Sequence, residues 1–138
     1  MDLDLDLAMR HLSWHDFDQA VESIARRCAQ DHFSGIYGIP RGGLVLAVTL
    51  SHRLQIPLVH EPQAHCLVVD DIYETGRTVE PFRDRPDLST WVWISKRPTD
   101  WWQAVEISSS NDWIVFPWEN PSAAGDDEKL YRASRLDG

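Results

Sequence analysis

The stretch HCLVVDDIYETGRTV, residues 65–79, decides the fold. Its apolar residues 66–69 predict a parallel strand buried on both faces, because such strands are continuous apolar runs. Asp70 and Asp71 stand at the carboxyl end of that strand, the edge at which open α/β sheets bind ligands. The turn over residues 74–78 is rich in hydroxyls and is expected to open a helix, whose free amides suit a phosphate. Pro81 and Pro86 bracket this helix and predict that it is brief. Carboxylates beside an anion-binding turn predict a ligand with hydroxyl and phosphate groups, and a divalent cation between them.

Strands and helices alternate on both sides of this stretch. A capping box of Ser13 and Asp16, followed by apolar residues at helical spacing, predicts a helix over residues 14–30. A strand over residues 35–39 and a helix over residues 44–54 follow. Further short strands are expected over residues 56–60, 91–95 and 104–107. This alternation predicts an α/β fold with a doubly wound, mostly parallel sheet.

The chain of 138 residues is long enough for one domain and contains neither a repeat nor a long linker. We expect an N-terminal arm over residues 1–12, a core over residues 13–119 and a C-terminal tail over residues 120–138. The alternating Asp and Leu of residues 1–7 fit an edge strand as well as a frayed or partner-bound arm. One short helical stretch, residues 126–133, is expected in the tail.

Composition excludes several classes of partner. The net charge of −9 argues against nucleic acid, whose affinity depends on Lys and Arg neutralising phosphates. No apolar run approaches the length of a membrane span. The two cysteines, Cys28 and Cys66, lie in apolar contexts and favour reduced thiols in a cytoplasm-like compartment. We therefore expect a cytoplasmic protein with neither a nucleic acid nor a membrane as its partner.

A second glycine-containing loop, Pro40-Arg41-Gly42-Gly43, separates the strand and the helix that precede the opening stretch. Two glycines allow backbone amides to approach an anion closely. Taken alone, this loop is as consistent with an ordinary turn as with an anion site. Its position one strand ahead of the acidic stretch favours the anion site.

Three segments carry a resemblance to a known family. Residues 68–78, VVDDIYETGRT, closely resemble the phosphoribosyl pyrophosphate (PRPP) binding motif of type I phosphoribosyltransferases. Residues 35–59 resemble the pyrophosphate-binding loop and following helix of the purine enzymes, in which the peptide before the arginine is often cis. Residues 111–119 resemble the base-recognition segment of xanthine-guanine phosphoribosyltransferase, to which the resemblance is strongest. The three motifs occur in the family order, which is a stronger signal than any one of them.

The resemblance implies Mg²⁺-dependent transfer of a 5-phosphoribosyl group from PRPP to a 6-oxopurine (xanthine, guanine or hypoxanthine), with release of pyrophosphate. It assigns Asp70 and Asp71 to the ribose hydroxyls, with Asp71 also at the metal, and Glu74 to the role of general base. The residues implied to bind PRPP and its phosphates are Arg41, Gly42, Gly43, Thr75, Gly76, Arg77 and Thr78. The residues implied to bind the base are Lys96, Trp113, Ile114 and Glu119. A homo-oligomer, either a dimer or a tetramer, is also expected.

The sequence departs from the family pattern in three places. Glu74 stands where the 6-oxopurine enzymes usually have Asp, so its carboxyl lies one methylene farther out. The long flexible loop that usually covers the site is reduced to a few residues around 61–64, which predicts a minimal version of the fold. Arg97 also intrudes between Lys96 and Pro98.

These departures leave alternatives open. One is a module of the same fold that senses PRPP or a nucleotide and has weak or no catalysis. The resemblance extends to the pyrimidine-operon attenuation regulators, although the acidic charge argues against RNA binding here. Another is that a partner subunit supplies the missing cover of the site. Each alternative keeps the implied PRPP-binding residues.

Overall fold

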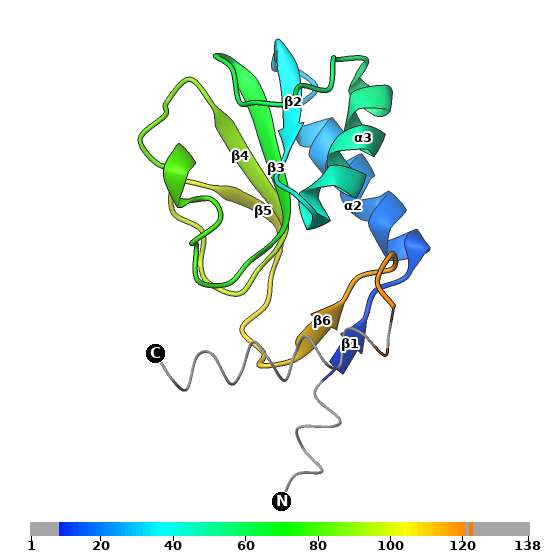
Figure 1. Ribbon diagram of the computed structural model, residues 1–138. Helices are drawn as coiled ribbons and strands as arrows, with labels where there is room; N and C mark the ends of the chain where they lie inside the picture. Colours follow the sequence, from blue (N-terminus) through cyan, green and yellow to red (C-terminus); the bar gives the residue numbers. More distant parts are fainter. Residues whose placement is uncertain (1–8, 121, 123–138) are drawn as a thin grey trace, which may run out of the picture. The chain divides into compact units, whose positions relative to one another are not determined.

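The computed structural model describes residues 9–120 and 122 (Figure 1). Most of the predicted arm and tail, including the helix expected over residues 126–133, lies outside the described residues. Two compact units are present: residues 9–18 with 110–120 and 122 form one, and Gln19–Ser109 the other. Their helices and strands, in chain order, are β1 (Met9–His11), α2 (Trp14–Arg27), β2 (Gly35–Gly38), α3 (Gly42–Leu54), β3 (Cys66–Tyr73), the 3₁₀ helix η1 (Glu80–Phe82), β4 (Ser89–Ser95), β5 (Gln103–Ile107) and β6 (Trp113–Val115).

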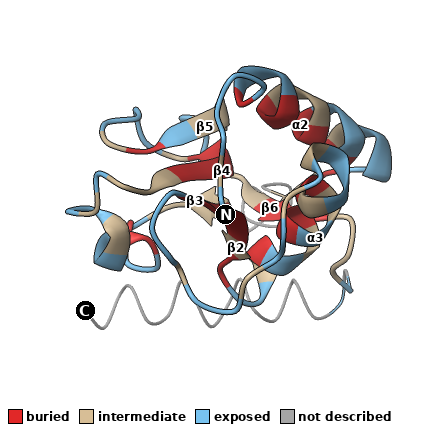
Figure 2. Cartoon of the chain, turned by 90° about the horizontal axis from the view of Figure 1, so that it is seen from above, coloured by how far each residue is buried: buried red, intermediate tan, exposed pale blue. Residues whose placement is uncertain are grey.

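The unit Gln19–Ser109 contains a parallel sheet in the order β2-β3-β4-β5. On the far side of β2, Leu58 forms an isolated parallel bridge with Ile36, so the strand expected over residues 56–60 is reduced to this bridge. The direction of winding therefore reverses between β2 and β3. The chain crosses to Leu58 through α3 on one face and to β4 through η1 on the other (Figures 1 and 2). The predicted doubly wound, mostly parallel α/β fold is confirmed.

Burial explains why the apolar run forms the central strand. The side chains of residues 66–69 project alternately from the two faces of the sheet, and all of them are completely buried. Leu46 and Leu50 of α3 and Ile24 of α2 are also fully buried, and Figure 2 shows these inward sides of the helices in red. Continuous apolar character in β3 thus reflects cover on both faces, as the sequence predicts.

The brief helix expected after the acidic stretch is present only as the 3₁₀ helix η1, and no α-helix begins at the turn itself. β3 continues through Asp70 and Asp71 to Tyr73, and only the three-residue η1 follows before β4. Pro86 disfavours helical geometry at the residue before it, which leaves no room for a longer helix. A phosphate at residues 75–78 would therefore meet turn amides and not the end of a helix dipole.

The other unit is a small sheet with an aromatic cluster. β1 and β6 pair in parallel, and the amide of Leu12 donates to the Val115 carbonyl at 2.9 Å. The predicted capping box is present, since the amides of Ser13 and Asp16 donate to each other's side chains at 2.8 and 3.0 Å. The ring of Trp118 stacks on Phe116, with centroids 5.2 Å apart. These contacts fix the backbone of the segment that contains Trp113 and Glu119.

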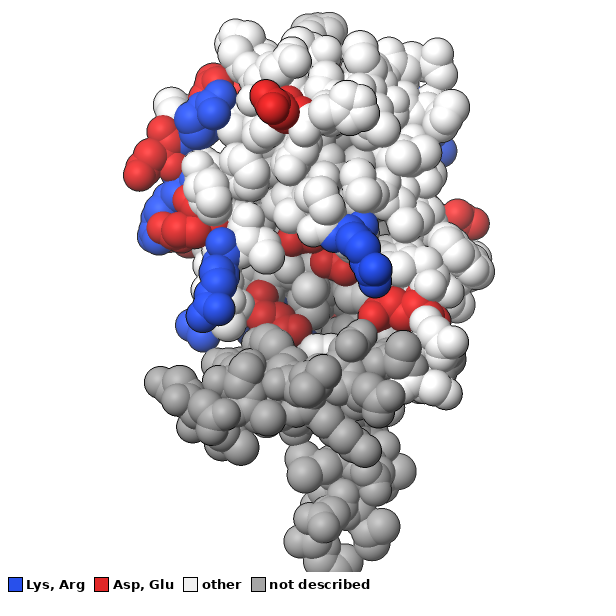
Figure 3. All heavy atoms as spheres, viewed as in Figure 1, with Lys and Arg blue, Asp and Glu red and all other residues white. Residues whose placement is uncertain are grey.

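Charged side chains are interspersed on the surface. On the face in Figure 3, Lys and Arg lie beside Asp and Glu and form no continuous basic patch among the described residues. Arg85 and Asp87 form a two-pronged pair with distances of 3.0 and 2.9 Å, and this guanidinium lowers the pKa of the Asp87 carboxyl. No helix in the described part of the chain has the length and apolar character needed to cross a membrane.

We predict that Leu46→Ala destabilises the fold far more than Val48→Ala. The two residues lie on the same helix, but Leu46 is fully buried whereas Val48 is 43% exposed. Loss of the buried side chain should cost about 2–5 kcal/mol in the free energy of unfolding, and loss of the exposed one within about 0.5 kcal/mol. Urea denaturation of both variants measures the difference. Equal losses would contradict this description of the core.

Candidate active site

The winding reversal brings the Arg41 loop into contact with the acidic end of β3. Gly42, at the start of α3, lies so close to Asp71 that a Cβ on the glycine would collide with the Asp71 carboxylate. A Cβ on Gly43 would lie 2.5 Å from the carbonyl oxygen of Val69. Glycine is required at position 43 because its backbone rests directly on the backbone of β3, and at position 42 it leaves room for the Asp71 carboxylate. The Pro40–Arg41 peptide is cis, as the resemblance led us to expect.

Asp70 is buried and organises the acidic end of β3. One carboxylate oxygen accepts the Asp71 amide at 2.8 Å, and the other accepts the Thr78 hydroxyl at 3.0 Å. Burial raises the pKa of Asp70, while the hydrogen bonds from Asp71 and Thr78 act in the opposite direction. Asp70 thus ties the far end of the phosphate loop, Thr78, to the end of β3. Asp71, the next residue, is only half-buried.

The phosphate loop, defined here as residues 74–78, has the features of an anion cradle. Gly76 has φ +83°, a left-handed conformation that favours glycine, and a Cβ there would collide with the Tyr73 hydroxyl. Among the described residues, the amides of Gly76 and Thr78 have no hydrogen-bond acceptor. An open pocket of about 530 Å³ is lined by Thr75, Gly76 and Arg77, with Glu80 and Pro81 beyond them. Successive turn amides of this kind bind anions without a helix.

The end of β4 lies beside the start of the phosphate loop. The Lys96 amide donates to the Tyr73 carbonyl at 2.8 Å, and Nε of Arg97 donates to the Glu74 carbonyl at 2.8 Å. Glu74 and Lys96 therefore directly follow the ends of two neighbouring strands. The sequence patterns do not identify the contacts of Tyr73 and Arg97, although Arg97 interrupts the Lys-Pro pattern of the family.

The predicted base-binding residues Trp113, Ile114 and Glu119 belong to the other unit. Trp113 and Ile114 lie on β6, and the Ile114 side chain is buried. One carboxylate oxygen of Glu119 accepts the Phe116 amide at 2.9 Å. The site described here is built from Gln19–Ser109 alone, so the base-binding role of these three residues stays a prediction.

The connection that would carry a flexible cover lies at the opposite edge of the sheet. Leu58 pairs with Ile36, and Cys66 pairs with Gly35, at the start of β2. Residues 59–65 therefore connect two points at the amino edge of the sheet. The Ser34 hydroxyl also donates to the Ala64 carbonyl at 2.7 Å, which holds this connection against the start of β2. The predicted shortening of the loop is confirmed.

The oxygen ligands that the site residues offer suit a magnesium ion whose other ligands come from water and from phosphate groups. Within the described residues, no three or more His, Cys, Asp or Glu side chains gather as a metal site. Mg²⁺ commonly takes one or two carboxylates and completes its shell with waters and substrate phosphates. Asp71, which lies beside the Gly42 backbone, fits such a partial set.

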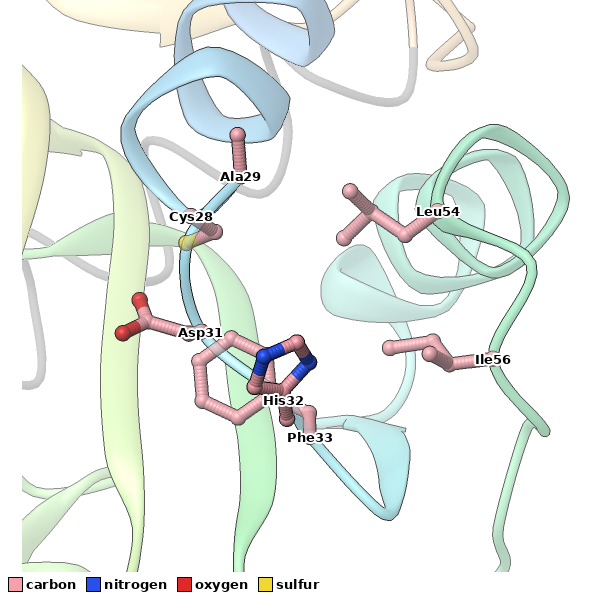
Figure 4. Close-up of a pocket in the computed structure, with 7 residues that line it drawn as sticks. All are labelled: Cys28, Ala29, Asp31, His32, Phe33, Leu54 and Ile56. Carbon is pink, nitrogen blue, oxygen red and sulfur yellow. The ribbon is translucent and has the colours of Figure 1, made fainter.

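A second cavity, of about 280 Å³, contains none of the predicted site residues. Figure 4 shows Leu54 and Ile56 on one side of it, with Cys28 and Asp31 on the other. Burial and the charge of Asp31 raise the pKa of the Cys28 thiol to about 11. The thiol is therefore protonated and unreactive at neutral pH.

The fold, with two loops at the winding reversal, is similar to that of one class of protein, the type I phosphoribosyltransferases. The crystal structure of a purine phosphoribosyltransferase from Pyrococcus horikoshii Ot3 is similar, with a TM-score of 0.70 and 26% sequence identity. The match covers 82% of this chain and 95% of that chain.

Sequence comparison points to one branch of that class. A xanthine-guanine phosphoribosyltransferase of Idiomarina loihiensis is 28% identical over 137 residues, covering 78% of this chain and 85% of that protein. One of Chromohalobacter salexigens is 26% identical over 135 residues, covering 78% and 82%. No protein-family model matches the chain. These similarities confirm the predicted resemblance to type I phosphoribosyltransferases and to the xanthine-guanine branch.

We predict that Asp70→Asn gains stability relative to the wild type as the pH rises. Because burial raises the pKa of Asp70, the folded protein holds this proton more tightly than the unfolded chain does. The stabilisation is complete below the ordinary pKa of about 4 and is lost as the pH rises through the folded-state pKa. Asn does not titrate, so its advantage should grow by about 1.4 kcal/mol per pH unit across that window.

Urea unfolding at a series of pH values measures this difference, and carbon-13 NMR of the Asp70 carboxyl measures the pKa directly. A pKa at or below 3.8, together with a pH-independent difference, would contradict the prediction.

Proposed function

We propose that the protein transfers a 5-phosphoribosyl group from PRPP to a 6-oxopurine such as xanthine, guanine or hypoxanthine, and releases pyrophosphate. One observation carries the proposal: the glycines of the Arg41 loop rest on the acidic end of β3 at the winding reversal. Ligands of open α/β sheets bind at this position. Two anion-binding loops on either side of a carboxylate match a ligand with phosphates at both ends and a sugar between them.

The two ends of PRPP have different partners in this proposal. Arg41 presents a guanidinium that can hold pyrophosphate with two parallel hydrogen bonds. Gly42 begins the thirteen-residue helix α3, whose positive end favours the same anion. Thr75 to Thr78 bind the 5-phosphate through amides and hydroxyls. Pyrophosphate and 5-phosphate are thus separated by the end of β3.

The carboxylates of Asp70 and Asp71 lie between the two proposed anion sites and bind the ribose. Asp71 binds ribose hydroxyls and holds Mg²⁺, which supplies charge neutralisation for the leaving pyrophosphate when it is bound. Asp70 also binds the ribose hydroxyls, and its carboxylate orients the Asp71 amide and the Thr78 hydroxyl. Charge on the ribose carbon resembles that in glycoside hydrolysis, where nearby carboxylates stabilise a developing cation.

Glu74 and Lys96 act on the base. Glu74 takes the proton of the purine N7, and Lys96 donates to the 6-oxo group. These two roles are supported by the position of both residues at the adjacent ends of β3 and β4, where the Lys96 amide donates to the Tyr73 carbonyl. Trp113 would stack on the purine, and backbone groups at Ile114 and Glu119 would meet its 2-position. We also propose that the protein works in the cytoplasm as a dimer or tetramer.

A second candidate is a module that binds PRPP or a nucleotide without efficient turnover. The connection over residues 59–65 lies at the amino edge of the sheet, away from Asp71, and cannot exclude water from the site. Glu74 also carries an extra methylene compared with the family pattern. A partner subunit that covers the site would restore the enzyme interpretation.

We predict that the protein forms a nucleotide from PRPP and at least one 6-oxopurine when Mg²⁺ is present. Mass spectrometry of reactions with xanthine, guanine, hypoxanthine, adenine, uracil and orotate identifies the product. Asp71→Asn and a reaction with a chelator are the controls, and both should lose turnover. If no base yields a nucleotide but calorimetry still detects PRPP binding, the sensing module replaces the enzyme.

We also predict that Gly42→Ala lowers kcat/KM by about 100-fold, because displacement of a reacting group by about 1 Å has that effect. The new Cβ collides with the Asp71 carboxylate. Ala otherwise favours a helix over Gly by about 1 kcal/mol, so the melting temperature should change little. Val48→Ala, on the exposed side of the same helix, is the control. Wild-type turnover in Gly42→Ala would remove the loop contact from the mechanism.

A further inference from the structure

Two consecutive carbonyl groups at the end of β3 accept hydrogen bonds from two consecutive residues after β4. The Lys96 amide donates to the Tyr73 carbonyl at 2.8 Å, which continues the ladder in which Tyr73 is level with Ser95. The Glu74 carbonyl accepts a bond from a side chain instead, Nε of Arg97, also at 2.8 Å. The first residue of the phosphate loop is therefore held by a guanidinium.

The backbone cannot supply a further bond here. Donors alternate along a parallel strand, so the next one after Lys96 would stand at Pro98, which has no N–H. The amide of Arg97 instead faces the Ser95 hydroxyl, at 3.4 Å. The Arg97 side chain thus fastens the loop at the point where the ladder ends.

Neighbouring contacts hold Arg97 and its acceptor in place. The Ser95 hydroxyl donates to the Arg97 carbonyl at 2.6 Å and accepts the Trp102 indole N–H at 3.2 Å. The Trp102 ring stacks on Tyr73, with centroids 3.7 Å apart and planes at 10°. Tyr73 in turn extends its hydroxyl over Gly76, in the middle of the phosphate loop. The Arg97 side chain, the Glu74 carbonyl and the phosphate loop are therefore linked through one connected set of contacts.

We propose that Arg97 is a positioning residue that holds the phosphate loop, residues 74–78, in its ligand-binding conformation. The proposal rests on the proposed function, because the ligand is the 5-phosphate of PRPP. Arg97 acts through the Glu74 backbone, so it places both the proposed base and the amides that follow it. It also gives a role to the residue that interrupts the family's Lys-Pro pattern.

The test compares Arg97→Ala, Arg97→Lys and the control Arg83→Ala. Arg83 is also exposed, but its ion pairs are with Glu80 and Asp100, outside the phosphate loop. Three quantities are measured for each protein: amide hydrogen exchange of residues 73–79, the dissociation constant of PRPP by calorimetry, and kcat and KM for nucleotide formation.

In Arg97→Ala we expect exchange in the loop and the dissociation constant of PRPP each to rise about tenfold, the effect of losing one hydrogen bond to a charged group. The melting temperature should stay near that of the wild type, because the lost bond is exposed. Arg97→Lys should recover part of the affinity, since it retains a charged donor without the planar fork. Added guanidinium ion should improve Arg97→Ala and leave Asp71→Asn unchanged. Arg83→Ala should behave as the wild type.

Unchanged loop exchange and unchanged PRPP affinity in Arg97→Ala would overturn the proposal. Faster exchange across the whole chain with a lower melting temperature would also overturn it, because Arg97 would then be a general stabilising residue. A wild type that neither binds PRPP nor forms a nucleotide would refute the proposed function. Faster exchange confined to the loop in Arg97→Ala would still support the positioning role in that case.

Discussion

The close approach of the Gly42-Gly43 backbone to the end of β3 is the constraint on which the candidate site depends. With no Cβ in the way, the start of α3 rests against the Asp71 carboxylate and the Val69 carbonyl. This contact sets the separation between the loop at Arg41 and the loop at residues 74–78. Both loops follow strands that are buried on two faces, so the sheet that forms the core also fixes the distance between the two segments proposed to bind anions.

A buried carboxylate completes this arrangement. Asp70 uses both oxygens to hold the Asp71 amide and the Thr78 hydroxyl, and it does so in surroundings that raise its pKa. Burial of an acidic group opposes folding unless hydrogen bonds satisfy it. The two hydrogen bonds offset this cost only in part, because the pKa is still raised, so we propose that Asp70 serves the site and not the stability of the core. Two adjacent acids thus have different environments and different tasks.

Sequence patterns predicted the parts of the site that depend on local chemistry. The apolar run of β3, the capping box at Ser13 and the glycines at 42 and 43 each follow from short-range rules, and each is present. Pro81 and Pro86 predict that the helix after Thr78 is brief, and the structure shortens it further to the three-residue 3₁₀ helix η1. The roles of Tyr73 and Arg97 depend on contacts across two strands, which no spacing along the chain encodes. The sequence also does not show that Trp113, Ile114 and Glu119 lie in a separate unit from the other predicted site residues.

The short connection over residues 59–65 has a kinetic consequence. It is fastened to Ser34 at the amino edge, so no closing motion of this segment is needed before a ligand enters or leaves the carboxyl edge. In enzymes with mobile covers, opening of the cover often limits the rate of product release. Here the residence time of a bound nucleotide would be determined by its own contacts with the loops. Affinity for product, rather than loop motion, would then set the upper limit on turnover.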